Sequence, residues 1–286
     1  MRTGPGLWQG IRKAGFAVPV RPSLDVLTAD LLDNLANPDP DHRALGLEIL
    51  ETWVRRGVYE PPALRAMGGR AVDNLKVGLG ERDTDTVFLR AGSLILLKRV
   101  VEADNRTAFL KPEELQAWLD ALVAYLENER DLRGYVPGKG WAHALAQAAE
   151  TLRLLALNRR LSPETLRRIL DVVGAKITAP VDEPFRYYED EWLAYTVRTI
   201  FRFKPLGVEE LKQWLAGLTD PAGHETWKEA PRSPSEAAAR YNTASLLRSL
   251  YFQLAASRER PPTAAQLVPA VREAIQELDI GFHELP

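Results

Sequence analysis

The stretch DPDHRALGLEILETWVRRG at residues 39–57 begins with a helix start signal and ends with a helix stop signal. Asp39, followed by a proline, has the pattern of an N-cap, and Gly57 has the pattern of a helix stop. Between them, Leu45, Ile49 and the apolar residues that follow recur at the spacing of one helix face. The stretch therefore predicts a helix of about four turns with one buried face.

The same combination of signals recurs along the chain as pairs of helices. The first helices of successive pairs are expected to begin near residues 40, 83, 140, 187 and 235. Such spacings are close to the period of roughly 40–47 residues that is typical of HEAT and armadillo repeats. Alternating strand patterns are nearly absent. We therefore predict an all-α, HEAT/armadillo-like array of stacked helical hairpins with about ten to eleven helices.

No change in composition divides the chain, so we predict a single all-helical domain over residues 1–286. Residues 1–20 contain several Gly and Pro and are expected to form an N-terminal extension docked on the body. Residues 224–234 combine polar side chains with two prolines and are expected to form a surface loop.

The composition excludes several functional classes. The 37 basic and 39 acidic residues nearly cancel, so the chain has no general attraction for nucleic acid or an anionic membrane. There is no cysteine and the four histidines are far apart, so we expect no metal site and no cofactor. No apolar run reaches the ~18 residues of a membrane span. We expect a soluble, cytoplasmic protein with no nucleic-acid partner.

The most unusual segment is ENERDLRGYVPGKGWAH at residues 127–143, which combines charged residues with the turn formers Gly and Pro. The Gly/Pro part lengthens one step of the repeat and is expected to be an inserted loop. A helix is then expected over residues 140–157, with Trp141 on its apolar stripe. Any site near this loop would be built at the start of that helix.

Three polar residues, His143, Gln147 and Glu150, share the face opposite the apolar stripe. This face is either a solvated surface, which is the usual case, or the lining of a site. For His143 the site is favoured, because it follows Gly-Lys-Gly in a first turn, where unpaired N–H groups can face an anion.

A second pair of features concerns charges that must be buried. Arg90 lies in a helix that is apolar on nearly every face, so its guanidinium needs a partner. Glu189 and Asp190 begin a later helix and point toward its buried side. We expect these carboxylates to pair with Arg90 or Arg133.

Several charged or polar residues lie near the starts of successive first helices, namely Arg43, Arg90, His143, Glu189, Asp190 and Arg240-Tyr241-Asn242. In a repeat array, equivalent positions align along one edge, so these side chains are expected to form a row. The row is either a ladder of structural salt bridges or a groove that binds a ligand. Both alternatives are consistent with the sequence.

The segments at 129–143, 87–93 and 189–191 carry a resemblance to a known family. With them the chain resembles the domain-of-unknown-function family numbered 2785, over about residues 40–205. The most specific part is Gly-Trp-Ala-His at 140–143. The resemblance implies a soluble all-helical protein and carries no established activity.

The chain departs from the family pattern at three positions. A second histidine is usual in that family where Gln147 stands, an aspartate where Glu150 stands and an arginine where Trp192 stands. Glutamine is a poor ligand for transition metals, so the resemblance does not imply a metal site here.

These features lead to a functional prediction with two alternatives. We expect a binding or scaffold protein with a charged groove for a peptide, a protein or an anionic small molecule. The first alternative is an enzyme with an acid–base site in the groove, and the weaker one is a HEAT-like DNA-repair glycosylase. The candidate catalytic residues are His143, Glu189 and Asp190, and the candidate ligand-binding residues are Arg90, Arg133, Lys139, Trp141, Gln147 and Glu150.

Overall fold

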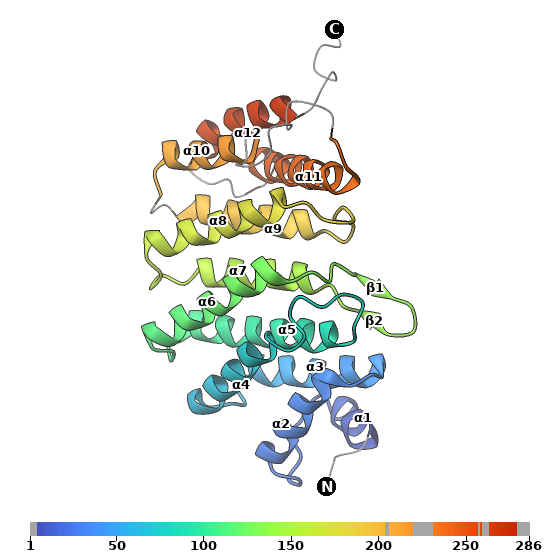
Figure 1. Cartoon of the computed structure of the whole chain (residues 1–286). Coiled ribbons are helices and arrows are strands. Elements are labelled where there is room, and N and C mark those ends of the chain that lie inside the picture. Colours follow the sequence, from blue (N-terminus) through green and yellow to red (C-terminus); the bar gives the residue numbers. More distant parts are fainter. Residues whose placement is uncertain (1–4, 204–205, 220–230, 257, 259–262, 279–286) are drawn as a thin grey trace. The chain divides into compact units, whose positions relative to one another are not determined.

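The computed structural model describes residues 5–203, 206–219, 231–256, 258 and 263–278. Within these residues the chain forms twelve α-helices, one 3₁₀ turn and a single two-stranded ribbon (Figure 1). The predicted all-α class is therefore confirmed. The chain divides into two compact units, residues 1–154 and 155–286, with the boundary near the end of α7.

The N-terminal unit contains the ribbon and the first seven helices. Its elements are α1 (Pro5–Lys13), α2 (Leu24–Asp33), the 3₁₀ turn η1 (Asn34–Ala36), α3 (Pro40–Arg55), α4 (Pro61–Asn74), α5 (Thr86–Arg106), α6 (Pro112–Asn128), β1 (Tyr135–Val136), β2 (Gly140–Trp141) and α7 (Ala144–Ala156). Helix α5 packs against both α3 and α4, and α4 packs against α6. Packing of a helix on the one two places later is the pattern of stacked hairpins.

The C-terminal unit repeats that packing pattern. Its helices are α8 (Pro163–Thr178), α9 (Glu189–Phe203), α10 (Val208–Thr219), α11 (Pro234–Ala256) and α12 (Ala264–Leu278). Helix α9 packs on α11, while α8 packs on α10 and α10 on α12. First helices thus contact first helices and second helices contact second helices, as expected for an all-α array.

Helix α1 and the residues just after it contact α3 within the N-terminal unit. Helix α1 packs against α3, and Trp8 in it is buried. Just beyond α1, the backbone oxygen of Phe16 accepts a hydrogen bond of 2.9 Å from Trp53 Nε1. A buried indole N–H finds a partner in this way, which fixes the extension to α3.

Three details differ from the prediction or lie outside what the structure describes. Helix α2 was not predicted, because its ten residues carry a short apolar pattern next to prolines. The helix expected over residues 140–157 begins only at Ala144, since the ribbon occupies residues 135–141. The loop predicted at 224–234 lies outside the described residues as far as residue 230, and α11 begins at Pro234.

Candidate functional site

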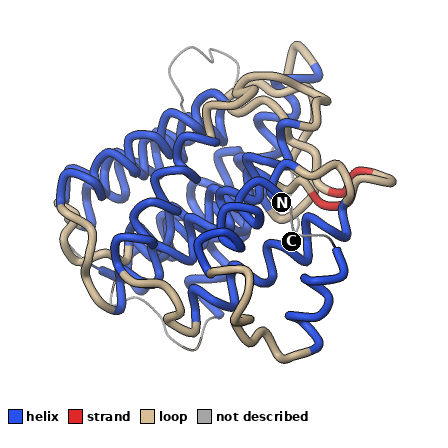
Figure 2. Tube along the Cα trace, turned by 90° about the horizontal axis from the view of Figure 1, so that it is seen from below, coloured by secondary structure: helices blue, strands red, loops and turns tan. Residues whose placement is uncertain are grey.

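A short β-hairpin stands where the helix start was expected. Tyr135 pairs with Trp141 across the two strands, and Figure 2 shows the strands on a loop that extends past the ends of neighbouring helices. Gly138 and Gly140 have φ of 74° and 83°, which glycine adopts without steric cost. The hairpin leaves Trp141 58% exposed. The prediction that Trp141 lies on the apolar stripe of a helix was therefore wrong.

The hairpin begins at a fully buried ion pair between Arg90 and Glu129. Arg90 Nε lies 2.7 Å from Glu129 Oε2 and Nη2 lies 3.0 Å from Oε1, so the contact is bidentate. Tyr125 donates a further hydrogen bond of 2.6 Å to Glu129. Burial alone lowers the pKa of Arg90, but its bonds to Glu129 outweigh this and hold the pKa above its usual value.

Two more cations fix the hairpin to the turn before α5. Arg133 contacts Asp131 Oδ2 at 2.6 Å and donates to the backbone oxygen of Thr84 at 2.7 Å. Lys139 Nζ lies 2.7 Å from Asp85 Oδ1. Arg90 and Arg133 thus pair with Glu129 and Asp131, and not with Glu189 or Asp190 as the sequence suggested. The partners are carboxylates of residues 129–131, which directly precede the hairpin, and not those of residues 189–190.

The hairpin also packs on the start of α3. Arg43 Nη2 donates to the backbone oxygen of Lys139. A Cβ on Gly140 would lie 3.1 Å from Pro40 Cβ and 3.7 Å from Arg43 Nη2, so a side chain at this position would press against α3. Together with its strained φ, this close approach explains why the position is a glycine.

Between the hairpin, α3 and α5 lies a cavity of about 550 Å³, which we call the Arg43 cavity. Its floor is apolar and comes from η1, α3 and α5, with Leu35, Leu47, Phe88 and Ile95 among the side chains. Its wall is polar or aromatic and includes Asp41, Arg43, Tyr135, Trp141, His143 and Gln147. The volume lies in the range of small-molecule sites, which combine apolar walls with few polar groups.

Arg43 is the buried cation of this cavity, with 8% of its surface exposed. Its guanidinium lies 4.1 Å from the centroid of the Phe88 ring. It donates to the backbone oxygens of Asn37 and Pro38 and to that of Lys139, but makes no ion pair within the described part of the chain. Burial therefore lowers its pKa, which the more distant Asp85 and Asp39 only partly restore.

His143 and Gln147 line the same cavity, one turn apart. His143 has φ of 55°, a left-handed conformation that is uncommon for residues other than glycine. Its N–H donates to the Arg133 oxygen at 3.0 Å and its oxygen accepts from Gln147 N at 3.2 Å, so the hairpin and α7 impose this conformation. Its ring centroid lies 5.6 Å from that of Trp141.

Glu150 continues the polar row of His143 and Gln147, but it does not line the cavity. Lys98 on α5, which is 6% exposed, contacts Glu150 Oε2 at 2.6 Å and Gln147 Oε1 at 3.2 Å. The face opposite the apolar stripe is therefore turned toward α5 and not toward solvent. His143 and Gln147 therefore line the cavity, whereas Glu150 forms an ion pair with Lys98.

The predicted carboxylates belong to the other unit. Glu189 is buried at the start of α9, where its Oε2 accepts a hydrogen bond of 2.7 Å from Tyr187 N. Asp190 accepts from Ser249 Oγ at 3.3 Å and lines a cavity of about 440 Å³. The charged row therefore separates into residues of the N-terminal unit and residues of the C-terminal unit.

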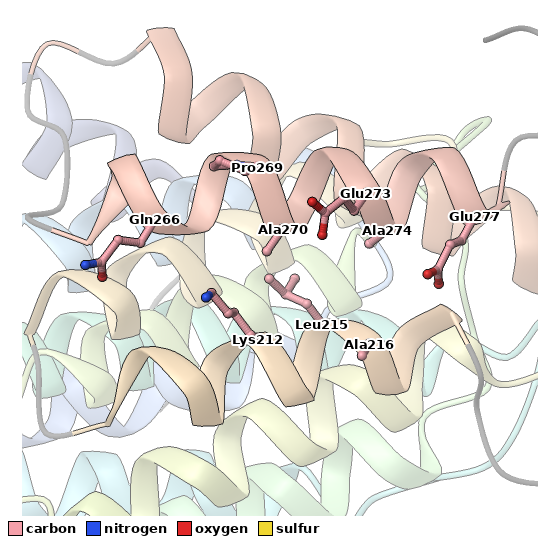
Figure 3. A pocket seen from close by; sticks show the side chains of 9 residues that line it. All are labelled: Lys212, Leu215, Ala216, Gln266, Pro269, Ala270, Glu273, Ala274 and Glu277. Carbon is pink, nitrogen blue, oxygen red and sulfur yellow. The ribbon is translucent and has the colours of Figure 1, made fainter. Parts of the chain in front are cut away.

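Another cavity of the C-terminal unit, of about 320 Å³, lies between α10 and α12 (Figure 3). Its apolar lining comes from Leu215, three alanines and Pro269, and four polar or charged side chains also line it. Two of its charged side chains already have partners, since Lys212 pairs with Glu209 at 2.9 Å and Glu277 accepts from Thr219 at 2.6 Å. It is thus a weaker candidate for a charged ligand than the Arg43 cavity.

Arg43, Phe88 and Tyr135 line the Arg43 cavity but are not among the ligand-binding residues predicted from the sequence. Arg43 was noted only as a member of the charged row, and Phe88 and Tyr135 were not considered. The sequence does contain a signal that Arg43 lacks a partner on its own helix. In the amphipathic helix that contains Leu45, no acidic residue follows Arg43 at the three- or four-residue spacing of a helical ion pair. Within the described residues, no group of three or more His, Cys, Asp or Glu side chains is arranged to hold a metal ion.

Comparison with known proteins places the chain at the level of a family. A family model described as "Protein of unknown function (DUF2785)" matches residues 75–252. The match begins later and extends further than the resemblance seen in the sequence. Searches of curated proteins and of solved structures found no match. None of the described helices has both the length and the apolar character needed to cross a membrane.

Proposed function

The chain belongs to the DUF2785 family of proteins of unknown function, and we propose that it is a soluble, cytoplasmic binding protein whose Arg43 cavity takes up a small organic anion. The observation that carries this proposal is Arg43 itself, a buried cation with no ion pair in the described part of the chain. A buried charge without a counter-charge is unfavourable, and an anionic ligand supplies one.

The donors of Arg43 support an anion as the ligand. A guanidinium has five N–H donors, and the three hydrogen bonds of Arg43 leave at least two of them for another acceptor. Carboxylates and phosphates match the planar geometry of this group. The acid on the cavity wall, Asp41, is exposed to solvent and makes no ion pair with Arg43.

The aromatic wall supports a ligand that also has an apolar body. Tyr135 and Trp141 are both more than half exposed, and their ring centroids lie 5.5 Å apart in an edge-to-face arrangement. Exposed Trp and Tyr side chains beside an apolar floor are typical of residues that dominate binding energy. His143 adds a third ring, whose centroid lies 5.6 Å from that of Trp141.

The enzyme alternative assigns acid–base chemistry to His143. It depends on a carboxylate near the imidazole, and Asp41 is the acid of the N-terminal unit that lines the same cavity. Glu189 and Asp190 are not among the residues that line this cavity. Binding therefore remains the function that we propose.

The test is titration with 2-naphthoate against its neutral analogue 2-naphthamide, followed by calorimetry and by the melting temperature. We expect the anion to bind and the amide to bind at least about tenfold more weakly. Arg43→Gln should weaken naphthoate binding by about tenfold to a hundredfold, because a charged hydrogen bond is lost. Equal affinity for naphthoate and the amide, or no binding of either, contradicts the proposal.

Two further variants separate binding from folding. Trp141→Ala removes an exposed ring and should weaken naphthoate binding without lowering the melting temperature of the free protein. Arg55→Gln removes the same charge from an exposed position on the same helix α3 and should leave naphthoate binding unchanged. If Arg55→Gln weakens naphthoate binding as much as Arg43→Gln does, the loss of affinity results from the change in net charge and not from a contact with Arg43.

A further inference from the structure

Four aromatic side chains of the C-terminal unit line a cavity of about 540 Å³, which we call the Trp192 cavity. Tyr188 directly precedes α9, Trp192 and Tyr195 lie in α9, and Phe252 comes from α11. Tyr188 is 63% exposed and Phe252 is 70% exposed. Aromatic side chains left in water on both sides of one cavity indicate a binding surface and not ordinary helix packing.

Two polar side chains of this wall, Glu191 and Gln253, offer acceptor oxygens. Glu191 lines the cavity with an exposed carboxylate that makes no hydrogen bond or ion pair within the described residues. Gln253 uses its Nε2 to donate to the backbone oxygen of Glu191 at 3.1 Å. Its Oε1 is buried and has no donor among the described side chains and backbone. Both groups are therefore suited to a partner that carries positive charge and N–H donors.

The rings already hold one cation at the far end of the cavity. The Arg198 guanidinium lies 5.6 Å from the centroid of the Tyr195 ring. Arg198 comes seven residues after Glu191 on the same helix, which places their backbones about 10 Å apart. The Glu191 carboxylate makes no ion pair with this guanidinium within the described residues and is therefore available to another cation.

We propose that the Trp192 cavity binds an organic ammonium group, a protonated amine with methyl or other apolar substituents. The faces of Tyr188, Trp192 and Phe252 attract a cation and contact its substituents. Glu191 supplies the counter-charge and Gln253 an acceptor for the N–H group. The inference is independent of the function proposed above, because the Arg43 cavity and the Trp192 cavity share no residue.

Such a group has two sources, a free amine or a methylated lysine side chain in a peptide. The first arm of the test is titration with N-methylphenethylamine against its neutral analogue 2-phenylethanol. The second arm is a short peptide with one dimethyl-lysine against the same peptide with acetyl-lysine. Binding is followed by the indole N–H resonance of Trp192 in the full chain, identified as the signal that Trp192→Phe removes.

We expect at least one cation to shift the Trp192 resonance and to bind about tenfold or more tightly than its neutral analogue. Binding of the free amine or of the dimethyl-lysine peptide identifies which of the two carries the ammonium group that the cavity recognises. Glu191→Gln should weaken this binding by about tenfold. Folding should be unaffected, because the exposed Glu191 carboxylate makes no hydrogen bond or ion pair within the described residues. Asp171→Asn removes one charge from an exposed position on α8 of the same unit and serves as the matched control.

Three results overturn the inference. They are the absence of binding in both arms, equal affinity for the cation and its neutral analogue, and unchanged affinity in Glu191→Gln. Phe252→Ala provides a second check, because it removes an exposed ring with little effect on packing. We expect it to weaken amine binding about threefold or more, and naphthoate binding to the Arg43 cavity should not change.

Discussion

The Arg43 cavity and the Trp192 cavity are built on the same local plan and differ in charge. In each, a residue in the left-handed region comes directly before a helix, His143 with φ of 55° before α7 and Tyr188 with φ of 66° before α9. In each, the oxygen of that residue accepts the first hydrogen bond of the helix, from Gln147 N and from Trp192 N. Exposed aromatic rings stand beside both.

The difference lies in which charged side chain has no ion pair among the described residues. The Arg43 cavity keeps a buried guanidinium from a neighbouring helix, whereas the Trp192 cavity keeps a carboxylate, Glu191, from the helix that forms its own wall. Aromatic rings can contact the apolar part of an anionic or a cationic ligand, so the charged side chain of each cavity determines which ligand is preferred. One helix-start geometry can therefore serve ligands of opposite sign.

The largest expected effect concerns the ion pair that supports only the first cavity. Glu129→Ala leaves the buried Arg90 without its partner and should destabilise the N-terminal unit by about 3–5 kcal/mol. Urea unfolding measures this loss, with Glu127→Ala at an exposed position as the control. Binding of the amine to the Trp192 cavity should persist. A loss below about 1 kcal/mol would mean that the pair does not anchor the hairpin.

The second prediction compares the effect of each charge variant on both ligands. Arg43→Gln should weaken naphthoate binding by about tenfold or more and leave the affinity for N-methylphenethylamine unchanged, and Glu191→Gln should do the reverse. Calorimetry of both variants with both probes is the measurement. If either variant weakens both ligands equally, the cavities are not distinguished by charge and the comparison fails.

The third prediction tests the shared backbone geometry. At an ordinary position glycine is less favourable than alanine, but at a left-handed position the order is reversed. Tyr188→Gly should therefore be more stable than Tyr188→Ala by about 1 kcal/mol, and His143→Gly more stable than His143→Ala by a similar amount. Since both variants of a pair lack the ring, thermal unfolding isolates the backbone contribution. Alanine being the more stable of a pair would show that the residue is not strained.

The smallest effect concerns the start of α3, which carries Arg43 and has no counterpart at α9. Asp39 caps this helix by accepting from Asp41 N and His42 N, and these bonds to the His42 and Asp41 backbone lower its pKa. The cap is complete above pH ~4, the ordinary pKa of Asp, and is lost as pH falls through the lowered value. A carboxyl titration by NMR should give a pKa below 3.8. A pKa at or above that value would contradict the cap.

The helical elements were largely predictable because their signals are local. Asp39 with Pro40 starts α3, and Ser162 with Pro163 starts α8, both as caps whose side chains accept backbone hydrogen bonds in the structure. The hairpin at 135–141 was not predicted, since its two-residue strands are too short for a periodic pattern. Its glycines and the left-handed His143 interrupt a pattern that otherwise continues as a helix.

The site was only partly predictable for a different reason. Sequence reasoning selected His143, Gln147 and Trp141, which line the Arg43 cavity, but it assigned ligand contacts to Arg90 and Arg133. These two guanidiniums are occupied by Glu129 and Asp131. Whether an arginine is paired depends on carboxylates that come close only after folding, and sequence spacing does not show this.

By itself, the sequence determined the all-α class, the paired helices and the lack of cysteine, because caps, breakers and apolar periodicity act within a few residues. The tertiary structure decided which charges are neutralised. It pairs Arg90 and Arg133 inside the protein and leaves Arg43 and Glu191 at cavities lined by aromatic rings. The physical reason is that the energy of a charge depends on its burial and its nearest counter-charge, which are set by contacts between distant segments.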